Sequence, residues 1–214
     1  MPPFHPRPED LPSEFAVFPL TGALLLPRGK LPLNIFEPRY LAMVQDSLAN
    51  GRMFGMVQPD PQDGLYRVGC LGRVSSFSET DDGRLLITLT GLLRFSFSTE
   101  LEMRRGYRRV RGDFCQYWGD LETDRAPAEI GRDKILAALR AYFTRRSVDA
   151  NWEAIRGLPD DALIITLAMA CPFEPVEKQA LLEAPDDADR AATLLALLEM
   201  GAAGPDLPSG HSVS

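Results

Sequence analysis

The sequence predicts an α+β protein in which a curved β pseudo-barrel is followed by an α-helical bundle. Over residues 15–114 the apolar side chains come in short extended runs, whereas beyond residue 120 they recur at helical spacing. Gly69, Gly72 and Gly91 lie inside strand-like runs, where glycine is typical of bulges and sharp bends. Several short strands with such bends fit a small curved sheet better than a parallel sheet with crossover helices.

The extended half of the chain contains one predicted helix and one predicted hairpin. Pro38 suits the first position of a helix, where its missing N–H costs nothing, and apolar residues then recur along one helical face. The Asn-Gly pair at 50–51 predicts the end of this helix, because glycine accepts the left-handed conformation found there. The Asp-Gly pair at 82–83 lies between two extended runs and predicts a tight hairpin turn.

Composition divides the chain into an arm over 1–13, a β-rich lobe over 14–122, a helical lobe over 123–201 and a tail over 202–214. The arm has five prolines and the tail is rich in Gly, Pro and Ser, so both are expected to lack fixed structure. In the helical lobe, Pro127 is expected to introduce a helix. The apolar run DDALIITLAMA predicts a buried helix. Two more helices follow, the second capped by Asp186 or Asp187.

Charge and composition exclude several classes of protein. The formal net charge of −7 disfavours non-specific binding to nucleic acid or to an anionic membrane. No apolar run approaches the roughly 20 residues that span a bilayer, and the N-terminus lacks the apolar run of a signal peptide. Cys70, Cys115 and Cys171 are far apart and lack metal-binding spacing, so free thiols are expected. We therefore expect a cytoplasmic protein without cofactor or metal.

Catalytic chemistry finds no support in the motifs. An ATP-binding loop needs GxxxxGK followed by Ser or Thr. The nearest candidate, Gly29-Lys30, is followed by Leu31 and has the wrong upstream spacing. A Ser–Lys protease dyad needs a desolvated lysine with a serine partner, which is not evident for Lys30, Lys134 or Lys178. The sequence therefore predicts a protein that is not an enzyme.

The most specific pattern is IFEPRY at residues 35–40, which joins an apolar run to the first helix. Its members Phe36, Glu37, Pro38, Arg39 and Tyr40 are expected to be structural, with the two charges tying the loop to the helix start. With the flanking FPL, LLP and LPL phrases, the stretch resembles the opening of the Lon protease N-terminal, substrate-binding domain. EKQALLE, DGRLLITLTGLLRFSF and YRRVRGDF extend the resemblance to roughly residues 14–200.

This resemblance implies a PUA-like pseudo-barrel beside a helical bundle, in a domain that binds polypeptides and has no chemistry of its own. It also implies a stand-alone bacterial member of the family that lacks the ATPase and protease domains. We therefore expect an adaptor or regulator in protein quality control. Its expected partners are unfolded or extended polypeptides, with a protease or chaperone acting in trans.

Leu24, Leu25 and Leu26 are the candidate peptide-binding residues. Because side chains alternate along a strand, Leu25 is expected to point away from its two neighbours. Its partner is either the helical lobe or an exposed groove, and the sequence leaves both open. In the second case, Leu25→Asp would abolish peptide binding and leave the melting temperature within a few degrees.

An alternative function is RNA binding by the basic segment MRRGYRRVR, in which a tyrosine lies among arginines. The acidic residues Glu100, Glu102 and Asp113 flank this segment, so ion pairing on a strand is favoured over nucleic-acid contact. Basic side chains on an exposed strand also oppose edge-to-edge aggregation. The candidate RNA contacts are Arg104, Arg105, Tyr107, Arg108, Arg109 and Arg111.

Overall fold

A computed structural model describes residues 6–62, 64–122 and 130–203. These residues form two compact units. The first unit contains the described residues up to 122 together with Ile165–Glu183, and the second contains residues 130–164 and 184–203.

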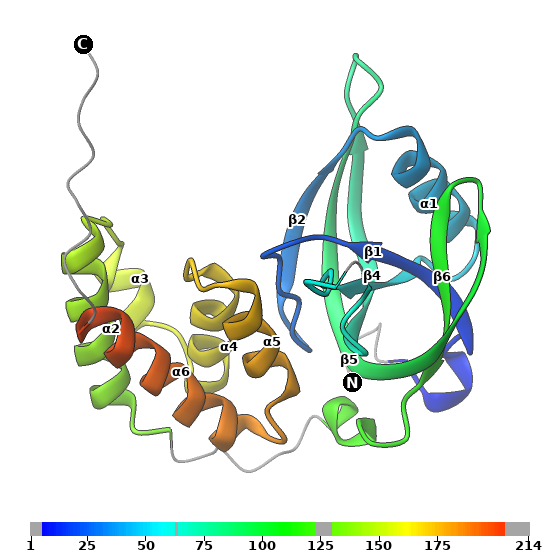
Figure 1. Ribbon diagram of the computed structural model, residues 1–214. Helices are drawn as coiled ribbons and strands as arrows, with labels where there is room; N and C mark the ends of the chain where they lie inside the picture. The colour runs from blue at the N-terminus through cyan, green and yellow to red at the C-terminus, as the bar shows by residue number, and fades with distance from the viewer. Residues whose placement is uncertain (1–5, 63, 123–129, 204–214) are drawn as a thin grey trace. The chain divides into compact units, whose positions relative to one another are not determined.

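The first unit is built on a six-stranded mixed sheet (Figure 1). The strand order is β2-β5-β4-β3-β1-β6, and β5 also pairs with β6, which closes the sheet on itself. β1 and β3 run parallel, and the other pairs are antiparallel. The predicted α+β class and curved pseudo-barrel are therefore confirmed. The strands are β1 (Glu14–Pro19), β2 (Lys30–Ile35), β3 (Met53–Val57), β4 (Val68–Glu79), β5 (Leu85–Arg104) and β6 (Tyr107–Asp113).

Two glycines create the bend between β4 and β5. The pairing register shifts between Leu71 and Gly72, and Gly72 lies opposite Gly91. A Cβ atom on Gly91 would lie 2.0 Å from the carbonyl oxygen of Leu26, and one on Gly72 would lie 2.5 Å from Cγ of Leu89. Side chains are therefore excluded at both positions, and the loop before β2 packs directly on the sheet.

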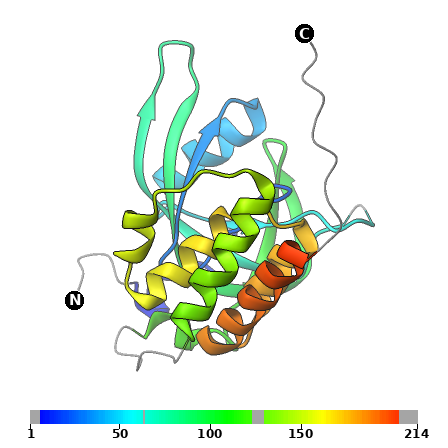
Figure 2. The ribbon, with the colours of Figure 1, turned by 90° about the vertical axis from the view of Figure 1, so that its left-hand side faces the viewer.

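The predicted helices are present, with corrected ends. In the first unit, α1 spans Pro38–Ala49, α5 spans Pro175–Glu183, and the second half of α4 (Asp160–Ala170) joins them. The second unit contains α2 (Arg132–Arg146), α3 (Trp152–Arg156), the first half of α4, and α6 (Asp187–Ala203), with α2 and α6 packed side by side (Figure 2). The 3₁₀ helices η1 and η2 span Pro8–Asp10 and Trp118–Leu121.

Three boundaries differ from the sequence prediction. The arm over 1–13 is partly ordered, because Pro8–Asp10 forms a 3₁₀ helix and Leu11 packs against the apolar core. The helix expected from Pro127 begins at Arg132, and Pro127 itself lies outside the described residues. The last helix continues to residue 203, and the predictions for residues 1–5 and 204–214 lie outside the described chain.

Helix α5 belongs to the sheet unit, although the sequence placed it in a helical lobe over 123–201. Two buried polar side chains of α5 explain this grouping. The ammonium of Lys178 donates to the carbonyl of Gly22 at 2.6 Å, and Nε2 of Gln179 donates to a carbonyl of β4 at 3.1 Å. These bonds attach α5 to β4 and to the loop between β1 and β2.

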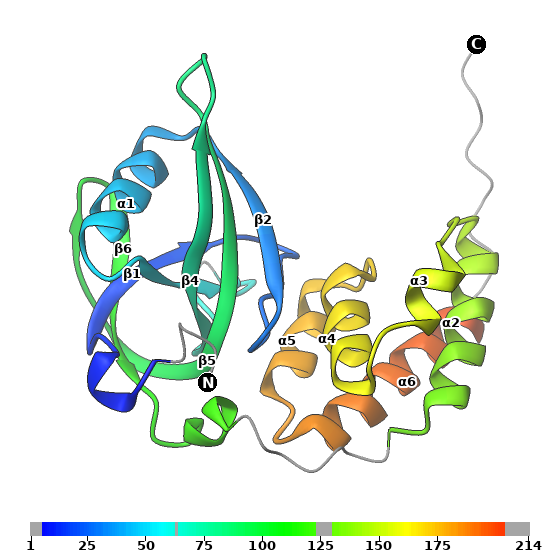
Figure 3. The ribbon, with the colours of Figure 1, turned by 180° about the vertical axis from the view of Figure 1, so that it is seen from behind.

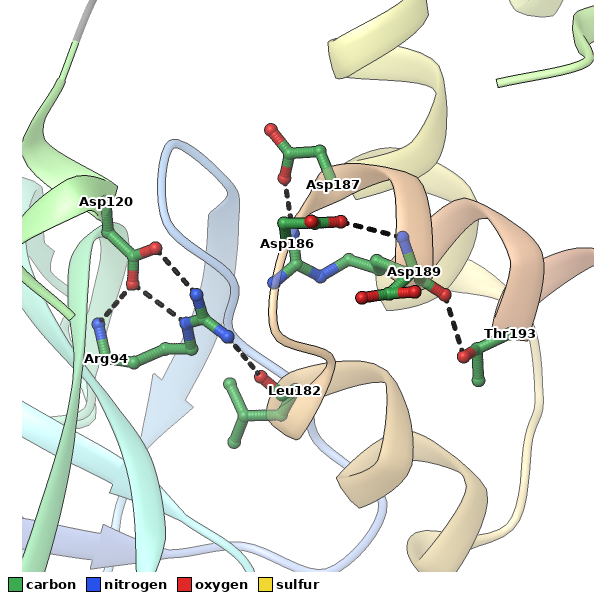
Figure 4. Close-up of polar contacts among 8 residues, drawn as sticks. Arg94, Asp120, Leu182, Asp186, Asp187, Asp189 and Thr193 are labelled. Carbon is green, nitrogen blue, oxygen red and sulfur yellow. Dashed lines mark hydrogen bonds and ion pairs between the residues drawn. The ribbon is translucent and has the colours of Figure 1, made fainter. Parts of the chain in front are cut away.

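A buried ion pair adds a third attachment (Figure 4). Arg94 of β5 and Asp120 of η2 have side chains that are each 4% exposed. Nε and Nη2 of Arg94 each donate to one carboxylate oxygen at 2.8 Å, and the backbone N–H of Arg94 donates to the same carboxylate at 3.0 Å. Nη1 donates to the carbonyl of Leu182 in α5 at 3.3 Å. One guanidinium therefore joins a strand, a 3₁₀ helix and α5.

The start of α6 in the second unit follows the sequence prediction. Oδ1 of Asp186 accepts a hydrogen bond from the backbone N–H of Asp189 at 2.8 Å (Figure 4). This side chain satisfies an N–H group that has no partner inside the helix.

We predict that Asp120→Asn destabilises the protein strongly, because it removes the carboxylate that pairs with the buried Arg94 guanidinium. Breaking a buried pair in this way costs about 3–5 kcal/mol, measurable by urea denaturation followed by circular dichroism. The control is Asp82→Asn, which removes an exposed ion pair with Arg84 and is expected to leave the denaturation midpoint nearly unchanged. Equal midpoints for the two variants would contradict the role of Arg94 and Asp120.

Candidate functional site

The three leucines at 24–26 are part of the core. Each is at most 2% exposed. Leu25 packs over the glycines of the sheet, because its Cδ2 lies 2.8 Å from the position of a Cβ on Gly72 and its Cγ 3.3 Å from one on Gly91. Of the two partners that the sequence leaves open for Leu25, burial argues against the exposed groove, and it leaves the candidate peptide-binding residues Leu24, Leu25 and Leu26 inaccessible in the free protein. The partner of Leu25 is a glycine floor formed by β4 and β5.

The IFEPRY residues begin α1 and hold it against β1. Nε of Arg39 donates to Oε2 of Glu37 at 3.0 Å, across the first turn of the helix. The Arg39 guanidinium lies 4.5 Å from the centroid of the Tyr40 ring, which lies 4.2 Å from the centroid of Phe18. Phe36 differs from the rest of the motif, because its side chain is 63% exposed.

A groove of about 410 Å³ lies between β2, the end of β1 and the start of α1. We call it the β2 groove. Its lining is mainly apolar, and the Glu37–Arg39 pair supplies the charged part of the wall. The exposed ring of Phe36 belongs to the same wall and is accessible to a partner. The lining residues are Phe18–Thr21, Pro32–Glu37, Arg39 and Tyr40.

Strand β2 borders this groove with an unpaired edge. Each other strand of the described sheet has at least two neighbours, whereas β2 pairs with β5 alone (Figure 3). Five of its six residues are exposed or partly exposed. Every second residue of such a strand directs its backbone groups away from the partner strand. Pro32 fits this position, because proline in a sheet is confined to edges, strand starts and bulges.

A second hollow, of about 530 Å³, also borders β2. It includes the exposed side chains of Phe77 and Leu86 on the β4–β5 hairpin, which extends beyond the other strands (Figure 2). The two hollows share Pro32–Asn34. The strand therefore combines open backbone groups with apolar surface that a second chain could cover.

The basic segment predicted as an RNA contact is paired with carboxylates. Arg108 binds Glu100 through two hydrogen bonds, at 2.6 and 2.7 Å, as its flanking charge predicted. The other carboxylates, Asp46 and Glu14, come from distant parts of the chain. Asp46 pairs with Arg104 and Arg105, and Glu14 pairs with Arg109 and Arg111.

Tyr107 takes part in the same pairing. Its hydroxyl donates to Oδ2 of Asp46 at 2.7 Å. Burial, together with this hydrogen bond, raises the pKa of Tyr107 to about 12. The hydrogen bonds from Tyr107 and Arg105 also hold the pKa of Asp46 below its ordinary value. Each of the five arginines in this segment thus pairs with one of three carboxylates within the chain.

Lys178 has a structural position. Its ammonium is bound to the carbonyl of Gly22, and burial lowers the pKa of Lys178. Over the described ranges, no group of three His, Cys, Asp or Glu side chains could hold a metal ion. No helix in the same ranges is long and apolar enough to cross a membrane.

We predict that Leu25→Ala lowers the free energy of unfolding by about 2–5 kcal/mol, because it leaves a cavity over the glycine floor. The matched control, Leu86→Ala, removes an exposed leucine and is expected to change stability by only about 0.5 kcal/mol. Urea denaturation measures both. A Leu25→Ala variant as stable as Leu86→Ala would show that Leu25 lies outside the core.

Residues 14–200 match the family model of the ATP-dependent protease La (LON) substrate-binding domain. Lon protease 2 of Myxococcus xanthus is 25% identical over 198 residues, which cover 89% of this chain and 24% of the relative. Lon protease 2 of Sorangium cellulosum is 30% identical over 106 residues, covering 44% of this chain and 13% of the relative. The chain thus spans at most about a quarter of the length of these curated relatives.

Solved structures show the same fold. A Lon N-terminal domain protein from Xanthomonas campestris aligns with a TM-score of 0.63 at 23% identity, and the N-terminal domain of the Mycobacterium avium complex Lon protease with 0.58 at 19%. Each alignment covers 86% of this chain and 97% of the other. The family match over almost the whole length and the shared fold establish that the chain belongs to the Lon substrate-binding domain family.

Proposed function

We propose that this chain is a non-catalytic polypeptide-binding module that acts as an adaptor or regulator in protein quality control. A protease or chaperone supplied in trans would act on the bound polypeptide. The observation that carries the proposal is the β2 groove, where an exposed phenylalanine adjoins an unpaired strand edge in a member of a substrate-binding family.

The chemistry of the groove suits an extended polypeptide. Backbone groups at an open strand edge recognise any sequence, while neighbouring apolar pockets add preference for particular side chains. Aromatic side chains are frequent among the residues that dominate binding energy. Phe36 can play this part, because its ring is exposed in the free protein and becomes covered when a partner enters the groove.

RNA binding remains the second candidate function, carried by the segment from Arg104 to Arg111. The ion pairs argue against it, since phosphate contacts would have to compete with the three carboxylates that already pair with the arginines. Such binding would weaken steeply with salt, which separates it from binding in an apolar groove.

The test is fluorescence anisotropy with labelled unstructured peptides and single-stranded RNA, each at low and physiological salt. We predict micromolar peptide binding that survives salt, and a loss of roughly tenfold or more in affinity for Phe36→Ser. Met103→Ser is the matched control, because Met103 is 65% exposed but lies on the β5–β6 hairpin. Both substitutions are at exposed positions and should leave the fold intact.

Three outcomes would count against the proposal. Equal loss in both variants would show that binding follows general surface hydrophobicity. If the peptides do not bind, and if RNA binds in a salt-sensitive way that Arg108→Glu/Arg109→Glu abolishes, the function is RNA binding by the basic segment. If neither the peptides nor the RNA bind, the proposal that this chain recognises polypeptides by itself is wrong.

A further inference from the structure

The end of the β4–β5 hairpin carries uncompensated negative charge. Glu79 and Asp81 are exposed, and neither has an ion-pair partner among the residues that the structure describes. Asp82, in contrast, pairs with Arg84 at 2.8 Å and accepts a hydrogen bond from Thr80. Two free carboxylates therefore remain at this end of the hairpin.

Strand pairing places this charge beside one end of β2. Ile35 lies opposite Leu85, and Leu85 lies opposite Glu79. Glu79 is thus two strand spacings, or about 10 Å, from the last residue of β2. Phe36 follows directly at the same end, so the exposed ring and the carboxylates lie at the same end of β2, with β5 between Glu79 and β2.

The opposite end of β2 has the opposite sign of charge. Lys30 lies opposite Thr90, and Thr90 lies opposite Arg73. Charge therefore changes from basic at the first residue of β2 to acidic at the last. An extended segment lying along β2 meets a different charge at each end, and this difference can select its direction.

We propose that β2 accepts an extended segment of another polypeptide as an additional strand, and that the segment carries basic residues where it passes Ile35. This inference rests on the proposed function of the β2 groove and specifies its ligand. Alternate side chains of the added strand face the β2 groove, so an apolar residue at every second position is required. Backbone hydrogen bonds to the open edge hold the segment in register.

Charge complementarity favours this occupant over an acidic one. An added strand lies on the other side of β2, three strand spacings or about 14 Å from Glu79, so the attraction is largely screened at physiological salt and is larger at low salt. A basic residue on the added strand shortens the separation further, because its long side chain reaches toward the hairpin. The overall charge of −7 acts in the same direction.

The first part of the test uses peptides with one alternating apolar core and either two lysines or two glutamates at one terminus. We expect the peptide with lysines at the terminus that passes Ile35 to bind at least about tenfold more tightly at low salt than the peptide with glutamates there. This difference in affinity should shrink at high salt. Glu79→Gln/Asp81→Asn should abolish most of this difference. Asp149→Asn/Glu153→Gln, which makes the same charge change in the second unit, should preserve it.

The second part tests strand addition through backbone methylation. Two versions of the basic peptide carry N-methyl groups on alternate residues, in the two possible patterns. Strand addition predicts that only the pattern on the edge facing β2 abolishes binding, because only those N–H groups donate to the protein.

The outcomes separate this inference from the proposed function. Peptides that bind regardless of charge and methylation pattern would overturn strand addition and leave polypeptide binding intact. Silence of every peptide would overturn both. Sedimentation of the free protein tests a further outcome. If the protein is a dimer, if Asn34→Pro makes it a monomer, and if peptides do not bind the monomer, then the β2 edge is occupied by a second copy of this chain.

Discussion

The pairing of β5 with three other strands determines which strand edge keeps unpaired backbone groups. Its first part pairs with β2 and β4, and its last part pairs with β6. The β5–β6 pairing closes the sheet, so the strands within the closure gain neighbours on both sides. β2 pairs with the first part of β5 and lies outside this closure. An unpaired edge is an aggregation hazard that proteins normally limit, and here Pro32 and two exposed polar residues limit it while leaving the edge accessible.

Strand β5 also anchors α5, through Arg94. Arg94 binds Asp120 and the carbonyl of Leu182, while Lys178 and Gln179 reach from α5 to the loop before β2 and to β4. Each of these polar groups is buried, and each would cost free energy if it lost its partner. The EKQ phrase of the sequence is therefore explained by attachment of a helix to the sheet. The apolar surface that we propose for recognition lies elsewhere, around β2 and the hairpin.

Elements with strong local signals were predictable from the sequence. Pro38 and the Asn-Gly pair bounded α1, the Asp-Gly pair marked the β4–β5 turn, and Asp186 capped α6. The site was not predictable, because it depends on pairing between distant residues. The burial of Leu25 follows from glycines of β4 and β5 that lie far along the chain. No local feature separates Phe36 from the structural residues of its motif, because nothing in the nearby sequence shows that the strand before it lacks a second partner.

The most direct test of the account is amide hydrogen exchange with and without the basic, alternating apolar peptide. Strand addition predicts slower exchange for every second amide of β2, those whose N–H groups point away from β5, because an added strand protects them. Residues 107–111 of β6 should be unaffected, since they are already paired with β1 and β5. Protection confined to residues 107–111, or peptide binding without protection of β2, would contradict the assignment of the site.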